Sequence, residues 1–195
     1  MSQLYAIGIG PGDGALIAPR ALEAIAASTD LVAYGLYLEL LGEAVHGKQC
    51  HELPLGEEIG RARRALDLAA SGRPTALISS GDIGIYAMAT LVFELLDQQQ
   101  RGMHQCPQWL DVEIEVVPGI SAMQACSSRV GAMLGHDFCT ISLSDLLTPW
   151  QLIQQRIDSA GSGDFVVCFY NPVSRKRDWQ LAEARDVLLR YRAPE

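Results

Sequence analysis

Two hydrophobic periods alternate along the chain. Short apolar runs predict β-strands, and these runs fall at residues 3–9, 30–34, 74–79, 112–117, 139–143 and 164–169. Segments with apolar residues at helical spacing predict α-helices between them, at residues 19–28, 57–71, 85–99, 121–131, 149–160 and 178–191. Strands that alternate with helices in this order are typical of an α/β fold with largely parallel sheets.

One segment without periodicity, residues 100–111, interrupts this alternation. It contains Gly102 and Pro107, residues that break helices and strands. The segment is expected to be either a domain boundary or an exposed excursion. We take it as a boundary and predict two α/β domains, one over residues 1–111 and the other over residues 112–195.

Composition and charge narrow the class of protein. The 195 residues are 49% hydrophobic and 19% charged, which excludes a disordered or collagen-like chain. A formal net charge of −8 disfavours nucleic acid as a partner. No apolar run reaches the roughly 18 residues that a membrane-spanning helix needs, and the N-terminus has no leader pattern. We therefore expect a soluble protein of the cytoplasm.

The five cysteines do not form a recognisable pattern. They are widely spaced and include no CxxC pair, so neither a disulfide framework nor a metal site is expected. Cys139 and Cys168 lie inside apolar runs and are expected to be small core residues.

A glycine-rich loop, Gly8-Ile9-Gly10-Pro11-Gly12-Asp13-Gly14, follows the first predicted strand. Glycines in such a loop can let backbone amides approach a phosphate, or they can simply allow a tight turn. The spacing does not fit a dinucleotide fingerprint, because Asp13 stands where the third glycine should be. A nicotinamide-dependent oxidoreductase is therefore a disfavoured alternative.

Two further loops follow later strands. They are Ser79-Ser80-Gly81-Asp82-Ile83-Gly84-Ile85-Tyr86 and Val117-Pro118-Gly119-Ile120-Ser121-Ala122. Loops at the carboxyl ends of parallel strands share one edge of the sheet, where α/β proteins usually bind ligands. These loops offer backbone amides and carbonyls, small hydroxyls and a carboxylate. A nucleoside joined to an amino acid would suit this set of groups better than a triphosphate.

The three loops, in this order, resemble those of the tetrapyrrole (corrin/porphyrin) methylases. The resemblance rests on Gly10-Pro11-Gly12-Asp13, Gly81-Asp82-Ile83 and Pro118-Gly119-Ile120-Ser121-Ala122, and it extends over essentially the whole chain. It implies two α/β domains with a cofactor cleft between them, the first on the substrate side and the second on the cofactor side. The family's last strands have no counterpart before Glu195, so the resemblance implies an incomplete second domain.

The resemblance also implies S-adenosyl-L-methionine as cofactor and S-adenosyl-L-homocysteine as its product. The implied cofactor contacts are Pro11, Ser80, Gly81, Asp82, Ile85, Ser121, Ala122 and Asn171. Ile83 stands where the family usually has proline, which loosens the turn without removing a group that the ligand needs.

Two later stretches narrow the resemblance to the ring-contracting methylases of cobalamin biosynthesis. They are Leu134-Gly135-His136-Asp137-Phe138 with 141–150, and Tyr170-Asn171-Pro172 with 174–177. The implied activity is C-methylation of a precorrin macrocycle at C(17) with ring contraction, on precorrin-3B or a cobalt-precorrin. Methylation of another macrocycle position, or of a protein or RNA, and a non-catalytic tetrapyrrole-binding role remain alternatives.

The chemistry of this reaction suggests further candidate residues. Ring contraction moves protons, so an acid or base is needed, and His136, Asp137 and Asp145 are the nearest candidates, although each could equally cap or pack. A polycarboxylate substrate would need cations, and Arg175, Lys176 and Arg177 follow a predicted strand. We expect the arginines at 61, 63 and 64 to form a solvated face. The family resemblance also implies a homodimer.

Overall fold

A computed structural model describes residues 2–174 and 177–194. Contacts between Cα atoms divide the chain into an N-terminal unit, Met1–Ala125, and a C-terminal unit, Cys126–Glu195. Each unit contains a parallel sheet with helices, so the α/β fold expected from the sequence is confirmed.

The N-terminal unit is built on a five-stranded sheet in the order β3-β2-β4-β1-β5. All of its strand pairs are parallel. The strands are β1 (Gln3–Gly8), β2 (Asp30–Ala33), β3 (Gln49–Glu52), β4 (Thr75–Ser79) and β5 (Glu113–Val117). The central strands β2 and β4 are buried at every position, as expected for a sheet covered on both faces.

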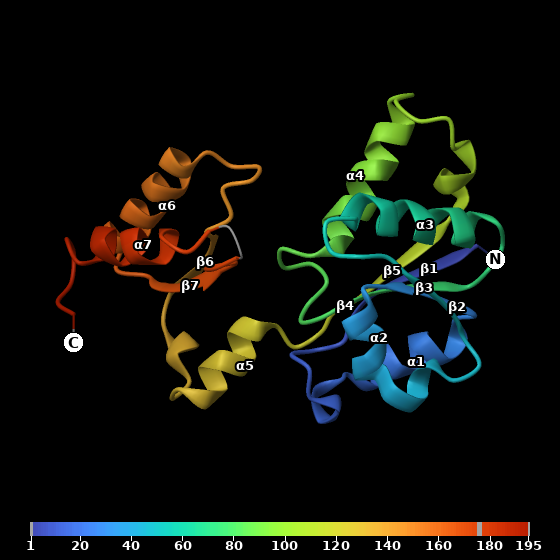
Figure 1. Cartoon of the computed structure of the whole chain (residues 1–195), viewed down its shortest axis with the longest axis horizontal. Helices are drawn as coiled ribbons and strands as arrows, with labels where there is room; N and C mark the ends of the chain where they lie inside the picture. The colour runs from blue at the N-terminus through green and yellow to red at the C-terminus, as the bar shows by residue number, and fades with distance from the viewer. Residues whose placement is uncertain (1, 175–176, 195) are drawn as a thin grey trace. The chain divides into compact units, whose positions relative to one another are not determined.

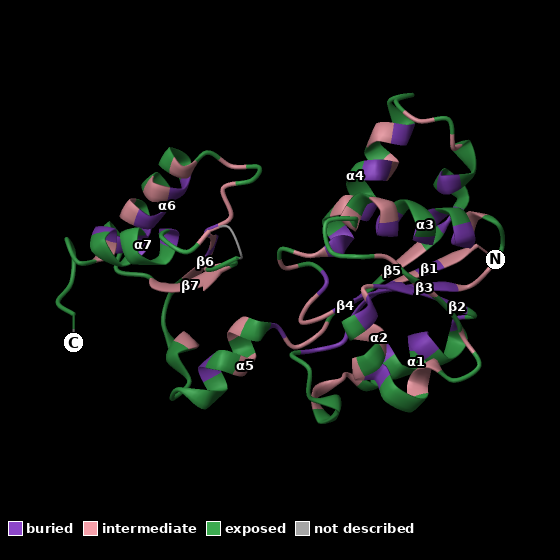
Figure 2. Ribbon diagram, viewed as in Figure 1, coloured by how far each residue is buried: buried purple, intermediate pink, exposed green. Residues whose placement is uncertain are grey.

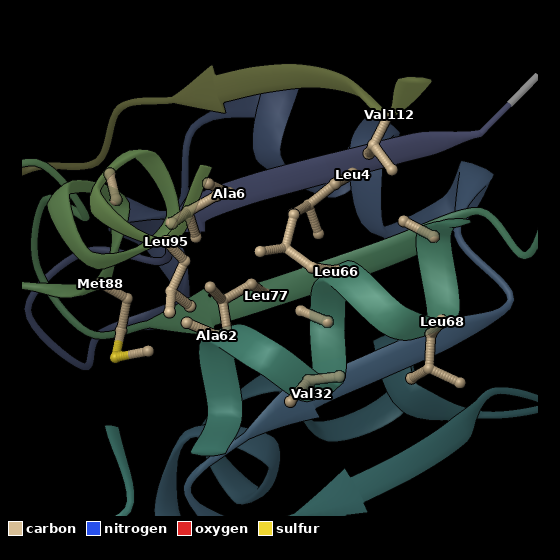
Figure 3. Packing of buried hydrophobic residues seen from close by; sticks show 14 of the residues in the cluster. Leu4, Ala6, Val32, Ala62, Leu66, Leu68, Leu77, Met88, Leu95 and Val112 are labelled. Carbon is tan, nitrogen blue, oxygen red and sulfur yellow. The ribbon is translucent and has the colours of Figure 1, made fainter. Parts of the chain in front are cut away.

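Helices cover both faces of this sheet (Figure 1). They are α1 (Pro19–Ala27), α2 (Gly35–Leu41), α3 (Glu58–Ala70) and α4 (Met88–Gln100). The α3 and α4 side has a core that includes Leu4, Leu66 and Leu77, which point toward one another in Figure 3. The opposite core includes Ile7 and Ile25 from β1 and α1. Figure 2 shows buried positions on the strands and on the helix faces turned toward them.

The expected boundary at residues 111 and 112 is corrected by the pairing of β5. The register of β5 with β1 runs from Gln3 opposite Glu113 to Ile7 opposite Val117, so β5 belongs to the N-terminal sheet. Most residues of the segment 100–111 are exposed, as expected of an excursion. Trp109 anchors it to the N-terminal unit: it is 3% exposed, and its indole N–H donates to Asp67 at 2.8 Å. The segment is therefore an exposed excursion and not a boundary, and the division falls after Ala125.

The C-terminal unit has a two-stranded parallel sheet of β6 (Phe138–Ser142) and β7 (Val166–Tyr170). Helices α6 (Trp150–Ser162) and α7 (Gln180–Leu188) pack on it, and α5 (Ala122–Arg129) precedes it. The core joins Ile141 and Leu143 to Ile153 and Ile157 of α6. Cys139 and Cys168 are half-buried, and burial raises the pKa of both thiols, which does not favour a role as nucleophiles.

Short 3-10 helices complete the described elements, at Gly14–Leu16, Gly42–Val45, Pro107–Asp111 and Met133–Gly135. Among the described residues, no helix has the length and apolarity to cross a membrane. The described part of the chain also contains no group of three His, Cys, Asp or Glu side chains placed to hold a metal ion.

Candidate functional site

The three glycine loops lie together at one edge of the N-terminal sheet. They follow β1, β4 and β5, and β1 lies between the other two strands. Because all three strands are parallel, their carboxyl ends meet at the same edge. The prediction that these loops share one rim is confirmed.

Backbone hydrogen bonds join the loops after β1 and β4. Gly10 and Gly81 exchange both N–H···O bonds, at 3.1 and 2.7 Å, and Ile9 donates to the Ser79 carbonyl at 2.9 Å. Gly10 and Gly81 have φ angles of +78° and +64°, values that glycine adopts without strain. The two loops therefore form one rigid piece of backbone.

The loop after β5 approaches the other two so closely that side chains do not fit. A Cβ atom on Gly8 would lie 2.5 Å from the Gly81 carbonyl oxygen and 2.9 Å from the Gly119 nitrogen. A Cβ atom on Gly119 would overlap the Gly81 oxygen and lie 2.6 Å from the Gly8 oxygen. Glycine at positions 8 and 119 therefore allows the backbone contact that brings the three loops together.

The carboxylate of Asp82 also ties the loops together. Its Oδ1 accepts from the Gly84 amide at 2.7 Å, within its own loop. Its Oδ2 accepts from the Gly119 amide at 3.1 Å, in the neighbouring loop. Asp82 thus positions the rim as well as adding a negative charge to it.

The remaining predicted cofactor residues of this unit lie on the same rim. Ser121 is 1% exposed, and its hydroxyl accepts from the Gln124 amide at 3.3 Å while the Gln124 side chain accepts from the Ser121 amide at 3.0 Å. This reciprocal pair is a capping box that starts α5. Ala122 and Pro11 are exposed, and Ser80 and Ile85 are half-buried.

The predicted contact Asn171 lies in the C-terminal unit, directly after β7. Its side-chain amide donates to the Ser142 hydroxyl at 3.0 Å, across the carboxyl ends of β6 and β7. Asp145 lies in the segment after β6 and accepts from the Gln180 amide at 3.2 Å. These residues form a second polar cluster, within the C-terminal unit alone.

The three candidate acid–base residues do not lie together. His136 and Asp137 are exposed and precede β6, whereas Asp145 follows it. A strand rises about 3.3 Å per residue, so the length of β6 separates the two groups. Which of the three serves as the acid or base of ring contraction therefore stays a prediction, and they are separate candidates.

The structure bears on two predictions about arginines. Arg177 is predicted to bind substrate carboxylates, and its side chain is 10% exposed with its guanidinium donating to the Leu143 carbonyl at 2.6 Å. Arg175 and Lys176 lie outside the described residues. Arg61 is expected on a solvated face, yet it is 4% exposed and pairs with Glu58 at 2.7 Å. Its Nε and Nη1 have no partner among the described residues.

Sequence reasoning missed the burial of Arg61 and the roles of Ser142 and Gln180. The only local signal is Glu58, which stands one helical turn before Arg61 and can pair with it. Gln180 is 1% exposed, a burial that depends on how α7 packs and that no sequence pattern marks. Ser142 accepts bonds from Ser144 and Asn171, which meet only because β6 and β7 pair.

The rim and the fold agree with membership in one family of methyltransferases. Residues 3–195 match the family described as Tetrapyrrole (Corrin/Porphyrin) Methylases. The chain belongs to this family, as the three loops predict. Its members are methyltransferases that generally use S-adenosylmethionine.

Individual relatives are similar over nearly the whole chain. The Cobalt-factor III methyltransferase of Priestia megaterium is 46% identical over 193 residues, which cover 99% of this chain and 35% of that protein. The Precorrin-3B C(17)-methyltransferase of a Sinorhizobium species is 40% identical over 188 residues, which cover 95% of this chain and 70% of that protein.

A solved structure supports the same family membership. The crystal structure of the methyltransferase CobJ matches with a TM-score of 0.88 and 38% identity, covering 98% of this chain and 77% of that one. This chain therefore spans about a third of the Priestia megaterium protein, and more than two thirds of the Sinorhizobium protein and of CobJ.

Proposed function

We propose that this chain carries out C-methylation of a precorrin macrocycle at C(17), with ring contraction, in cobalamin biosynthesis, using S-adenosyl-L-methionine. The observation that carries the proposal is the rim formed by the loops after β1, β4 and β5. The names of the two relatives, one a methyltransferase of cobalt-factor III and the other of precorrin-3B, support it.

The groups on the rim fit this cofactor. The three loops contain no Lys, Arg or His and two aspartates, Asp13 and Asp82. A polyphosphate would be repelled there, whereas a ligand with a sulfonium and an ammonium group would be attracted. We propose that it is held by the rim residues Pro11, Ser80, Gly81, Asp82, Ile85, Ser121 and Ala122, together with Asn171 of the C-terminal unit.

The cofactor supplies an activated methyl group, so the protein needs no strong nucleophile of its own. What the chain supplies is alignment. The paired glycines 10 and 81 and the Asp82 carboxylate hold the rim rigid before any ligand arrives, so little ordering remains to be done on binding. Product S-adenosyl-L-homocysteine would leave from the same groups.

Proton movements during ring contraction require an acid or base. We propose that His136 or Asp137, which are exposed, serves this role, since the Asp145 carboxylate is engaged by Gln180 and lies near Arg177.

A methyl-transfer assay tests the proposed function. The chain is incubated with methyl-labelled S-adenosylmethionine and either precorrin-3B or its cobalt-containing counterpart. We expect one of the two substrates to gain the mass of one methyl group, and a carbon NMR spectrum to show the label at C(17). Label at another carbon would favour a methylase for a different position, and no transfer to either substrate would refute the proposal.

We also propose that the protein is a cytoplasmic homodimer. Leu146 and Leu147, in the segment after β6, are 85% and 99% exposed, and association would remove such apolar surface from water. Light scattering at micromolar concentration should give twice the mass of the chain. A monomer mass would contradict the proposal.

A further inference from the structure

Arg177 joins the two segments that follow the strands of the C-terminal sheet. Its Nη1 donates to the Leu143 carbonyl, after β6, at 2.6 Å. The same nitrogen donates to the Asn171 carbonyl, after β7, at 3.1 Å. One guanidinium therefore fixes the carboxyl ends of both strands relative to each other.

The Asn171 backbone needs such support. Its φ angle is +50°, in the left-handed region that residues with a side chain rarely adopt, although asparagine tolerates it better than most. Strained conformations of this kind persist where surrounding contacts hold them. Here the carbonyl is held by Arg177 and the side-chain amide by the Ser142 hydroxyl.

Arg177 is itself held in place. Its Nε lies 3.7 Å from Asp145 Oδ1, and Asp145 Oδ2 accepts from the buried Gln180 amide at 3.2 Å. Two backbone bonds between Ser174 and Arg177, at 2.8 and 3.2 Å, fix the backbone of Arg177 itself. The Arg177 side chain is 10% exposed, so a substrate carboxylate could reach its guanidinium only by displacing these partners.

We infer that Arg177 is a positioning residue for the cofactor site, acting through Asn171, and not a substrate-binding cation. The inference rests on the proposed function, because the resemblance to the family is what makes Asn171 a cofactor contact. Arg177 keeps Asn171 in its left-handed conformation, with its side chain directed to Ser142.

The experiment compares Arg177→Ala and Arg177→Lys with a matched control, Arg185→Ala. Arg185 lies on α7 with its side chain 67% exposed and pairs with the adjacent Asp186, so its loss removes the same charge without touching Asn171. S-adenosylmethionine affinity is measured by calorimetry, and the tetrapyrrole KM is measured at saturating cofactor. Thermal unfolding monitors stability.

We expect Arg177→Ala to weaken S-adenosylmethionine binding about tenfold or more, because Asn171 loses the charge-assisted bond to its carbonyl that holds it in place. Arg177→Lys should recover only part of this, because an ammonium cannot reproduce the geometry of the guanidinium fork. Arg185→Ala should bind as the unmodified chain does. The tetrapyrrole KM should change less than about twofold in every variant, since no substrate contact is lost.

A raised tetrapyrrole KM with unchanged cofactor affinity would overturn the inference and restore Arg177 as a substrate ligand. Equal cofactor affinity in all variants would overturn it as well. If Arg177→Ala does not fold, Asp145→Asn decides, because it loosens Arg177 without removing it and should weaken cofactor binding in the same direction. Unchanged binding in that variant would contradict the inference.

A readout without cofactor separates this inference from the proposed function. The side-chain amide resonances of Asn171 in nitrogen–proton NMR spectra should shift in Arg177→Lys and stay in place in Arg185→Ala. If the unmodified chain does not bind S-adenosylmethionine while these resonances shift, the proposed function fails and the positioning of Asn171 stands. If the resonances do not move, the positioning itself is refuted.

Discussion

Gly119→Ala should destabilise the N-terminal unit by about 3 kcal/mol, at the upper end of what overpacking usually costs, and should abolish S-adenosylmethionine binding. The added Cβ would overlap the Gly81 carbonyl oxygen and lie 2.6 Å from the Gly8 oxygen. Both are backbone atoms of neighbouring loops, so no side chain can rotate away to make room. Relief requires the loop after β5 to move off the rim, which also removes the Gly119 amide from Asp82.

Urea unfolding and calorimetric titration measure the two effects, and Gly14→Ala is the matched control. A Cβ on Gly14 would meet no atom within 4 Å, and the φ angle of Gly14 lies outside the left-handed region. Its unfolding midpoint should therefore stay the same. If Gly119→Ala bound the cofactor as tightly as the unmodified chain, the close packing of the three loops would not be what forms the site.

Most elements of the fold follow from local patterns. The six predicted strands and six predicted helices are all present, because apolar periodicity reports which face of a segment meets the core. The missed strand β3, with the sequence Gln49-Cys50-His51-Glu52, is an edge strand whose positions are mostly exposed. Such a strand is held by hydrogen bonds to one neighbour and needs no apolar run.

The domain boundary could not be placed from local patterns. The strand β5 is close in sequence to the C-terminal unit, yet it pairs with β1 at the start of the chain. This pairing joins residues more than a hundred positions apart, and the composition along the chain does not predict it.

The candidate site could likewise be predicted only in part. The order of the three loops predicts the rim, because glycine spacing and strand order can be read directly from the sequence. Whether a charged side chain is free depends instead on its partners in space. Arg177 and Arg61 have the same local appearance as solvated arginines, but carbonyls and buried helix faces surround them only after folding.

Asp30→Asn should destabilise the protein by about 3 kcal/mol near neutral pH, in the range for bonds to a buried charge. Asp30 opens β2 and is 0% exposed. Its carboxylate accepts from the Thr29 hydroxyl at 2.8 Å and from the His51 Nε2 at 2.7 Å, and it pairs with Arg73. An asparagine NH₂ in this place would be a hydrogen-bond donor that faces other donors, so it would find no acceptor.

The protonation of His51 follows from its other neighbour. Arg64 lies 3.2 Å from the His51 Nδ1 and can only donate, so Nδ1 accepts and Nε2 carries the hydrogen given to Asp30. Asp30 therefore has several donors, and all of them favour its charged form. Burial alone would raise the pKa of Asp30, but the bonds from His51 and Thr29 and the charge of Arg73 outweigh it and lower the pKa below 3.8.

This lowered pKa gives the effect of Asp30→Asn a defined pH dependence. A carboxyl whose pKa is lower in the folded protein stabilises it fully above the unfolded pKa, and the contribution is lost as pH falls through the folded value. The difference in unfolding free energy between the unmodified chain and Asp30→Asn should therefore be largest near neutrality and shrink below about pH 4. Urea unfolding across this range measures it.

Asp97→Asn is the matched control. It alters an exposed carboxylate paired with Arg101 at 3.0 Å and should change stability by less than about 1 kcal/mol at any pH. A loss in Asp30→Asn that stayed constant with pH would show that shape, and not the buried charge, holds β2 in place.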